Sequence, residues 1–186
     1  MGKRVLVTIG TGFEEIEALT VVDILRRAEM EVVLAGVEED TPVVGRSNIS
    51  IVPDTGLSQA LESGPFDMIV LPGGLPNAHI LRDDSRVTGA VKEQVARGGY
   101  VAAICAAPLA LDKAGVLEGR RCTSHPAICE DLGGRDYSDD PVVVADRVIT
   151  SRAAGTAMAF AFAILRELTG PEKVEEVNAG VLAPLS

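Results

Sequence analysis

Short apolar runs alternate along the chain with segments in which apolar positions recur every three or four residues. The runs end at glycine or proline, which is typical of buried strands, whereas the recurring segments are typical of amphipathic helices. Strands separated by helices form βαβ units. We therefore expect an α/β fold with a mostly parallel sheet and helices on both faces. The predicted strands cover 4–9, 31–35, 67–71 and 100–104, and the predicted helices cover 14–28, 87–97, 106–114 and 155–169.

The last third of the chain has a different pattern. Two short apolar runs, 141–145 and 148–151, flank Asp146-Arg147 and predict a hairpin, and a further helix begins at Pro171. No linker, repeat or low-complexity segment interrupts the 186 residues. This length suits one domain, so we expect a single domain over residues 1–186.

The charge and composition exclude several classes of partner. The net charge is −10, from 27 acidic and 17 basic residues, and such a field repels nucleic acid and anionic membranes. The chain has no tryptophan, two tyrosines and four phenylalanines, so it offers no aromatic platform for stacked bases. The longest strongly apolar stretch near the C-terminus, 153–165, is shorter than the ~20 residues of a membrane span. We expect neither nucleic acid nor a membrane as partner.

The three cysteines form no Cys-x-x-Cys pair and no even framework, which indicates free thiols in a reducing compartment. The apolar run after Lys3-Arg4 is too short for a signal peptide. We therefore expect a cytoplasmic location.

Several reactive residues follow predicted strands. Because ligands of parallel sheets bind beyond the carboxyl ends of the strands, we expect these residues to meet at one edge. Glu14, Glu15 and Glu17 follow the first strand, Gly73 and Gly74 follow 67–71, Cys105 follows 100–104, and His125 follows the short segment 121–124.

Cys105 is the centre of this group. It stands between a strand and a helix among small residues, Ala103, Ala106 and Ala107, which permit a sharp turn like that of a nucleophile elbow. At the start of a helix, free N–H groups stabilise a thiolate, so we expect a lowered pKa and an ionised sulfur. The alternative is a buried core cysteine.

The other candidates each have a structural alternative. Glu14 and Glu17, three residues apart, share a helix face, and a carboxyl beside a thiolate would hold and shuttle a proton. We expect Glu15 to be a solvated residue of an acidic helix start. Gly73 and Gly74 would offer N–H groups to an oxyanion, or form a plain turn. His125 is a site residue or a structural or exposed histidine. We expect His79 to be exposed and Cys122 and Cys129 to be structural or incidental.

The sequence gives no sign of a cofactor or a metal. Gly10-Thr11-Gly12 begins like a dinucleotide fingerprint, but Glu15 stands at the third glycine position and acidic residues repel a pyrophosphate. The two histidines have no matching cysteine spacing for zinc.

Five motifs follow one another along the chain: Gly12-Phe-Glu-Glu-Ile-Glu17, Val70-Leu-Pro-Gly-Gly74, Ala102-Ala-Ile-Cys-Ala-Ala-Pro108, Thr123-Ser-His-Pro126 and Thr150-Ser-Arg-Ala-Ala-Gly-Thr156. In this order they resemble the ThiJ/PfpI superfamily (class I glutamine amidotransferase-like), and within it the branch of the Parkinson-disease protein and its bacterial ThiJ-like relatives. The resemblance implies a flavodoxin-like three-layer sandwich, usually a homodimer, with Cys105 reactive and hydrogen-bonded by Glu17. It also implies that Glu14 and His125 lie at the site and that the amides of Gly73, Gly74 and Ala106 line an oxyanion site.

Three departures from family patterns refine this resemblance. Ala106 stands where peptidase-like members have histidine, and Ala127 stands where glutamine amidotransferases have an acid, so both activities are disfavoured. The segment 43–52 carries no cysteine, unlike the Parkinson-disease protein, which argues against redox behaviour that needs secondary thiols.

The leading hypothesis is a glutathione-independent glyoxalase that converts methylglyoxal, a small aldehyde, to lactate through a Cys105 thiolate, with a deglycase activity on early glyoxal adducts as its extension. The alternative is an oxidative-stress redox sensor or chaperone that forms a Cys105 sulfinate. A cysteine hydrolase or peptidase is the least favoured reading.

Overall fold

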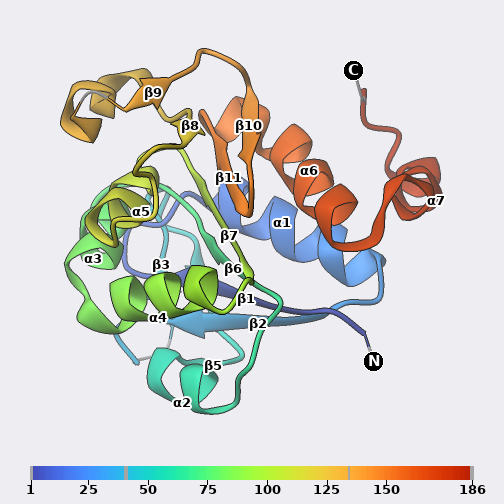
Figure 1. The fold of residues 1–186 in the computed structure, drawn as a ribbon. Helices are drawn as coiled ribbons and strands as arrows, with labels where there is room; N and C mark the ends of the chain where they lie inside the picture. Colours follow the sequence, from blue (N-terminus) through green and yellow to red (C-terminus); the bar gives the residue numbers. More distant parts are fainter. Residues whose placement is uncertain (1, 40–41, 134, 185–186) are drawn as a thin grey trace.

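The computed structural model describes residues 2–39, 42–133 and 135–184. A twisted central sheet lies between two layers of helices (Figure 1). Its strand order is β10-β11-β7-β6-β1-β2-β5, and all neighbours are parallel except β10, which pairs antiparallel with β11. The strands of this sheet are β1 (Arg4–Ile9), β2 (Glu31–Gly36), β5 (Thr55–Gly56), β6 (Met68–Leu71), β7 (Tyr100–Ile104), β10 (Val142–Ala145) and β11 (Val148–Ser151).

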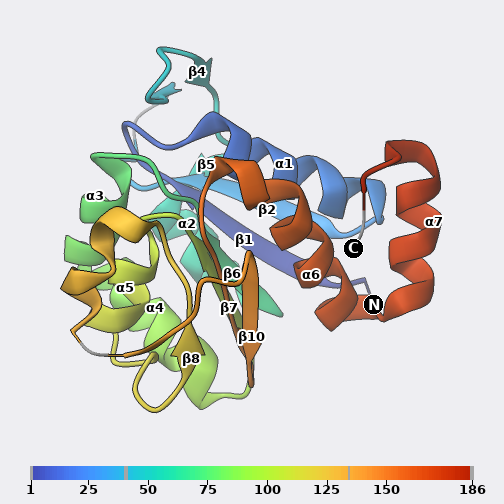
Figure 2. The same ribbon diagram turned by 90° about the horizontal axis from the view of Figure 1, so that it is seen from above.

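Two hydrophobic cores, one on each face of the sheet, hold the layers together. Alternate residues of a strand point to opposite faces, so Val5 and Val7 of β1 pack in one core and Leu6 packs in the other. Figure 2 shows α1, α6 and α7 on one side of the sheet and α3, α4 and α5 on the other. The helices are α1 (Glu15–Arg27), α2 (Leu57–Glu62), α3 (Asn77–Asp83), α4 (Ser85–Ala96), α5 (Pro108–Lys113), α6 (Ala157–Thr169) and α7 (Pro171–Val181).

The predicted three-layer, flavodoxin-like α/β architecture is confirmed, and the strands 4–9 and 100–104 have the predicted ends. The helix predicted over 106–114 is shorter, because the residues after Cys105 form a turn before α5 begins at Pro108. The helix predicted from Gly155 is preceded by a 3-10 turn, Ala154–Thr156, before α6.

Sequence periodicity missed the shortest elements, which contain too few residues to show a period. They are α2, α3, β5, the hairpin of β3 (Val43–Val44) and β4 (Ser50–Ile51), the pair β8 (Arg121–Cys122) and β9 (Asp136–Tyr137), and the 3-10 turns Pro126–Ile128 and Glu130–Leu132.

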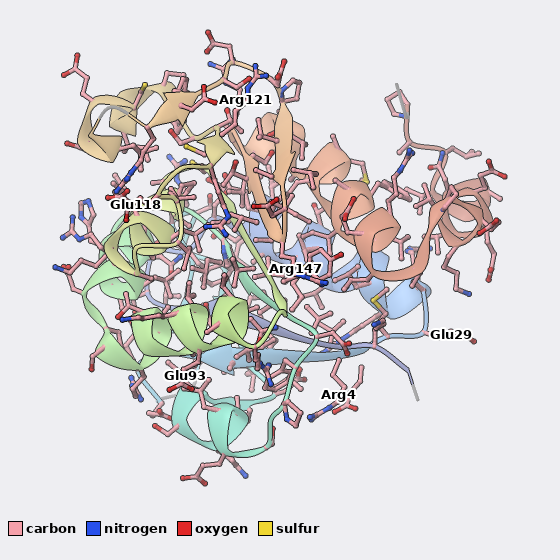
Figure 3. The ribbon with its side chains drawn as sticks, in the orientation of Figure 1. Arg4, Glu29, Glu93, Glu118, Arg121 and Arg147 are labelled. Atoms are coloured by element: carbon pink, nitrogen blue, oxygen red, sulfur yellow. The ribbon has the colours of Figure 1, made fainter. Side chains whose placement is uncertain are left out.

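The parallel strands place their carboxyl ends, and the loops after them, at one edge of the sheet. In register, Val7 pairs with Val70 and Leu71 pairs with Ala103, so β1, β6 and β7 end side by side. Arg4, which begins β1, and Arg147, which precedes β11, mark the opposite, amino edge (Figure 3). None of the helices within the described ranges has the length and apolar character needed to cross a membrane.

Candidate active site

Cys105 occupies a strained turn directly after β7. Its φ angle is +65°, a left-handed conformation that is uncommon for a residue with a side chain and concentrates at functional sites. Two backbone hydrogen bonds hold it there: its N–H donates to the carbonyl of Ser151 (2.9 Å), and its carbonyl accepts from the N–H of His125 (2.8 Å). The sharp strand-to-helix turn that the small neighbours predicted is confirmed, and the cysteine is half-buried rather than sealed in a core.

The acidic residues at the start of α1 are all buried. Glu14, Glu15 and Glu17 are 7%, 6% and 1% exposed. The expectation that Glu15 is solvated is therefore wrong. Its Oε1 accepts the N–H of Ser47 over 2.8 Å, because the β3–β4 hairpin folds over the start of α1. Hydrogen bonds from backbone N–H groups outweigh the effect of burial and lower the pKa of Glu15.

Glu17 and Cys105 meet above Gly73. A Cβ placed on Gly73 would lie 2.6 Å from the Cβ of Cys105 and 2.7 Å from Oε2 of Glu17, so no side chain fits at this position. The N–H of Gly73 already donates to Oε2 of Glu17 over 2.7 Å. This corrects the predicted role of Gly73, because its amide holds the carboxylate and is not free to bind an oxyanion.

The amides that face the sulfur are those of Gly74 and Ala106, and hydrogen bonds from both favour the ionised form of Cys105. Gly74 has a φ angle of +88°, and a Cβ at this position would clash with the backbone of Gly12, Phe13 and Glu14, which leaves no room for a side chain. The structure thus brings two of the three predicted amide donors to the thiol.

Burial and mutual repulsion set the ionisation of the Glu17–Cys105 pair. Burial raises the pKa of Glu17 to about 7, although the Gly73 N–H and the Cys105 thiol oppose this shift. Burial, followed by the charge of Glu17, raises the pKa of Cys105 to about 12. The expected lowering of the thiol pKa is therefore wrong, since two amides do not outweigh burial and the facing carboxylate.

Above about pH 7 the two groups consequently share one proton, and each suppresses the second ionisation of the other. Oε1 of Glu17 is buried and has no hydrogen-bond partner within the described ranges, so it is free to take that proton. Such a pair can activate its sulfur by passing the thiol proton to the carboxylate during an attack, without holding a permanent thiolate.

A cavity of about 260 Å³ opens in front of the sulfur. His125 is half-buried on its wall, and its Nδ1 accepts the N–H of Ala127 over 3.1 Å. This bond places the proton of a neutral imidazole on Nε2, which is then a donor. The lining residues are Arg46, Gly74, Leu75, Cys105, Ala106, His125, Ala127 and Ile128.

Glu14 is not among the residues that line this cavity. Its Oε2 accepts a hydrogen bond from Arg46 over 2.9 Å, and this ion pair ties the β3–β4 hairpin to the site. Sequence reasoning missed Arg46, Leu75 and Ile128. Arg46 and Ile128 follow no strand of the main sheet, and Leu75, directly after Gly74, is an apolar residue with no reactive group. The short turn Gly45-Arg46-Ser47-Asn48 between apolar residues is the only local signal for the hairpin.

The remaining candidates lie elsewhere. Cys122 is fully buried, Cys129 is half-buried and His79 is exposed, as predicted for the histidine. In the part of the chain that the structure describes, no three His, Cys, Asp or Glu side chains are grouped as a metal site.

Comparison with known proteins gives consistent matches over nearly the whole chain. Residues 3–167 match the model of the DJ-1/PfpI family. The chain is 43% identical to protein dj-1beta of Drosophila melanogaster over 98% of both chains, and the crystal structure of that DJ-1beta superposes with a TM-score of 0.94 at full coverage of both. It is 39% identical to the glutathione-independent glyoxalase DJR-1.2 of Caenorhabditis elegans, over 88% of this chain and 87% of that protein. The structure of oxidized Toxoplasma gondii DJ-1 is 32% identical, with a TM-score of 0.94 over 99% of this chain and all of that one.

Proposed function

The chain belongs to the DJ-1/PfpI family, and on that premise we propose that it converts methylglyoxal to lactate through Cys105 without glutathione. The observation that carries the proposal is the arrangement around one sulfur atom. Glu17 lies on one side to take the thiol proton, and the Gly74 and Ala106 amides face the sulfur beside an open cavity. The name of the nematode relative supports the choice of substrate.

In the first step, the sulfur attacks the aldehyde carbon of methylglyoxal while Glu17 accepts the thiol proton. The carbonyl π bond breaks, and the oxygen, stabilised by the amides of Gly74 and Ala106, is protonated to give a hemithioacetal. With a pKa of about 7, Glu17 is matched to accept and return a proton at neutral pH.

In the second step, the hydrogen of the former aldehyde carbon leaves as a proton and is delivered to the neighbouring carbon through an enediol. Glu17 carries this proton, assisted by His125, whose Nε2 donates to the substrate oxygen. The product is a lactyl thioester of Cys105. Water then hydrolyses the thioester, which releases lactate and restores the thiol, so that methylglyoxal and water are the only reactants consumed. Glu14, held by Arg46, acts on Glu17 through its charge.

Purified protein given methylglyoxal, without glutathione and with a chelator present, tests this function. We expect lactate above the buffer rate, abolished in Cys105→Ala and retained in Cys129→Ala, which removes another half-buried thiol. Lactate at the buffer rate, or equal rates in wild type and Cys105→Ala, would reject the proposal. A deglycase activity would extend the proposed function to glyoxal adducts. It is tested on purified adducts from which the free aldehyde has been removed.

A second candidate function is redox sensing by Cys105. The oxidized state of the Toxoplasma relative favours it, as do the amides that would hold an anionic sulfur oxide. Two equivalents of peroxide would convert the thiolate first to a sulfenate and then to a sulfinate, releasing one water each time. Mass spectrometry after mild peroxide is expected to show two added oxygens on Cys105 alone. Equal oxidation of Cys105 and Cys129 would argue against sensing.

We also propose that the protein is a homodimer. The β3–β4 hairpin docks on the start of α1, and both segments carry exposed apolar side chains. These are Ile16, Ile49 and Val52, which are 55%, 51% and 72% exposed. Such a group of apolar residues is typical of an interface between protein chains.

A further inference from the structure

Asn77 is a fully buried amide beside the site that the proposed chemistry does not use. It is the first residue of α3, and its side chain joins the ends of two strands. Its Oδ1 accepts the N–H of Gly10, after β1, over 2.7 Å. Its Nδ2 donates to the carbonyls of Pro72 and Gly73, after β6, over 2.8 and 2.9 Å. Both hydrogens of the amide are therefore used on the loop that passes beneath Cys105.

One of these bonds fixes the peptide group between Pro72 and Gly73. Its carbonyl accepts from Asn77, and its N–H is the group that donates to Oε2 of Glu17. A peptide group is planar, so holding its carbonyl on one side fixes the direction of its N–H on the other. A hydrogen bond accepted by the carbonyl also polarises the N–H and makes it a better donor.

We infer that Asn77 is a positioning residue that aims the Pro72–Gly73 peptide N–H at the Glu17 carboxylate and thereby tunes the reactivity of the Cys105 thiol. The charged or titratable groups that act on Glu17 are Cys105, Glu14 and Arg46. Within the described ranges, the side chain of Asn77 bonds only to the backbone of Gly10, Pro72 and Gly73, so its effect on Glu17 passes through the loop.

The chain contains a matched control at the other end of β6. Gln94 is also a buried amide, 1% exposed, and its Nε2 donates to the carbonyls of Phe66 and Asp67 just before β6. Gln94 therefore makes equivalent bonds at the amino edge, far from the thiol. If a buried amide had only a structural role here, Asn77→Ala and Gln94→Ala would have the same effect.

The test is the pH dependence of Cys105 alkylation by iodoacetamide, followed on the Cys105 peptide by mass spectrometry. The Gly73 N–H lowers the pKa of Glu17, so weakening that bond in Asn77→Ala is expected to raise this pKa. The midpoint of the Cys105 alkylation profile is then expected to move upward by about one pH unit. Asn77→Ser, whose hydroxyl stands one bond short of the Nδ2 position and so does not reach the Pro72 carbonyl, is expected to shift the midpoint in the same direction. Gln94→Ala is expected to lower the melting temperature but to leave the midpoint in place.

The inference is overturned if folded Asn77→Ala or Asn77→Ser keeps the wild-type midpoint, or if Gln94→Ala moves it equally. A measurement on the wild type adds an independent check: the Gly10 amide, bonded to Asn77, is expected to exchange slowly with solvent, and fast exchange would also overturn it. The inference concerns the same site as the proposed function. Because alkylation needs no methylglyoxal turnover, however, the two can fail separately.

Discussion

The N–H of Ser47 donates a 2.8 Å hydrogen bond to the buried carboxylate of Glu15, and this bond docks the β3–β4 hairpin onto the start of α1. Two backbone bonds support the same contact: Gly12 donates to Val44, and Arg46 donates to Phe13. The hairpin in turn supplies Arg46 to the cavity wall. Glu15 thus shapes the site without facing it.

Glu15→Gln is expected to lower the free energy of unfolding at pH 7 by about 1–2 kcal/mol, because a charged acceptor is lost from a buried bond. The pKa of Glu15 is lowered by folding. Its contribution is therefore present above the ordinary value of 4.5 and is lost as pH falls through the lower folded value. Urea denaturation between pH 7 and pH 3 is expected to show the two proteins converging in acid. Glu93→Gln, on the exposed side of α4 (Figure 3), is the control, and an equal effect of both changes would contradict the prediction.

The stability of the wild type is expected to fall as pH rises, and Glu17→Gln is expected to abolish this fall. Folding raises the pKa of Glu17 from 4.5 to about 7, so the folded state keeps a proton that the unfolded chain releases near 4.5. Between these values wild-type stability falls with rising pH, by about 3 kcal/mol in total. Glutamine has no proton to lose. Denaturation midpoints at pH 4.5, 6 and 8 check this, and parallel pH slopes for the two proteins would show that Glu17 is not perturbed.

Gly73→Ala is expected to distort the thiol site. The new Cβ would lie 2.6 Å from that of Cys105 and 2.9 Å from the carbonyl of Ile104, neither of which can move freely. We expect a loss of about 1–3 kcal/mol from overpacking and at least a tenfold slower alkylation of Cys105. Gly89→Ala, in α4 with open space around it, is the control and is expected to stabilise the protein by about 0.5–1 kcal/mol. Wild-type alkylation in Gly73→Ala would contradict the geometry.

Ile49→Asp is expected to convert the proposed homodimer into a monomer, because a charge within an apolar interface is costly to desolvate. Light scattering coupled to size exclusion measures the change, with wild type expected at twice the 19.4 kDa chain mass. Val144→Asp, at an exposed apolar position on β10, is the matched control and is expected to leave the mass unchanged. A wild-type monomer, or an Ile49→Asp dimer, would remove this interface.

Sequence pattern alone predicted the layered α/β fold and the placement of Cys105 at a sharp turn. Both depend on local properties: buried parallel strands are continuous apolar runs, and the small residues around Cys105 permit its turn. Because parallel strands end at a common edge, the order of strands along the chain also brought Glu17 and Gly74 toward the cysteine.

Tertiary structure decided what those residues do. Burial of Glu15 required the hairpin, which is too short to have a detectable period, and the role of the Gly73 amide depended on the direction of a single peptide group. The pKa of Cys105 depends on its distance from Glu17 and on the loss of water around both, and neither quantity is encoded in the residues next to it. Asn77 shows the same limit: its bonds reach Gly10, far away in sequence, so no local pattern marks it. Secondary structure follows from neighbours along the chain, whereas proton affinity and hydrogen-bond direction follow from neighbours in space.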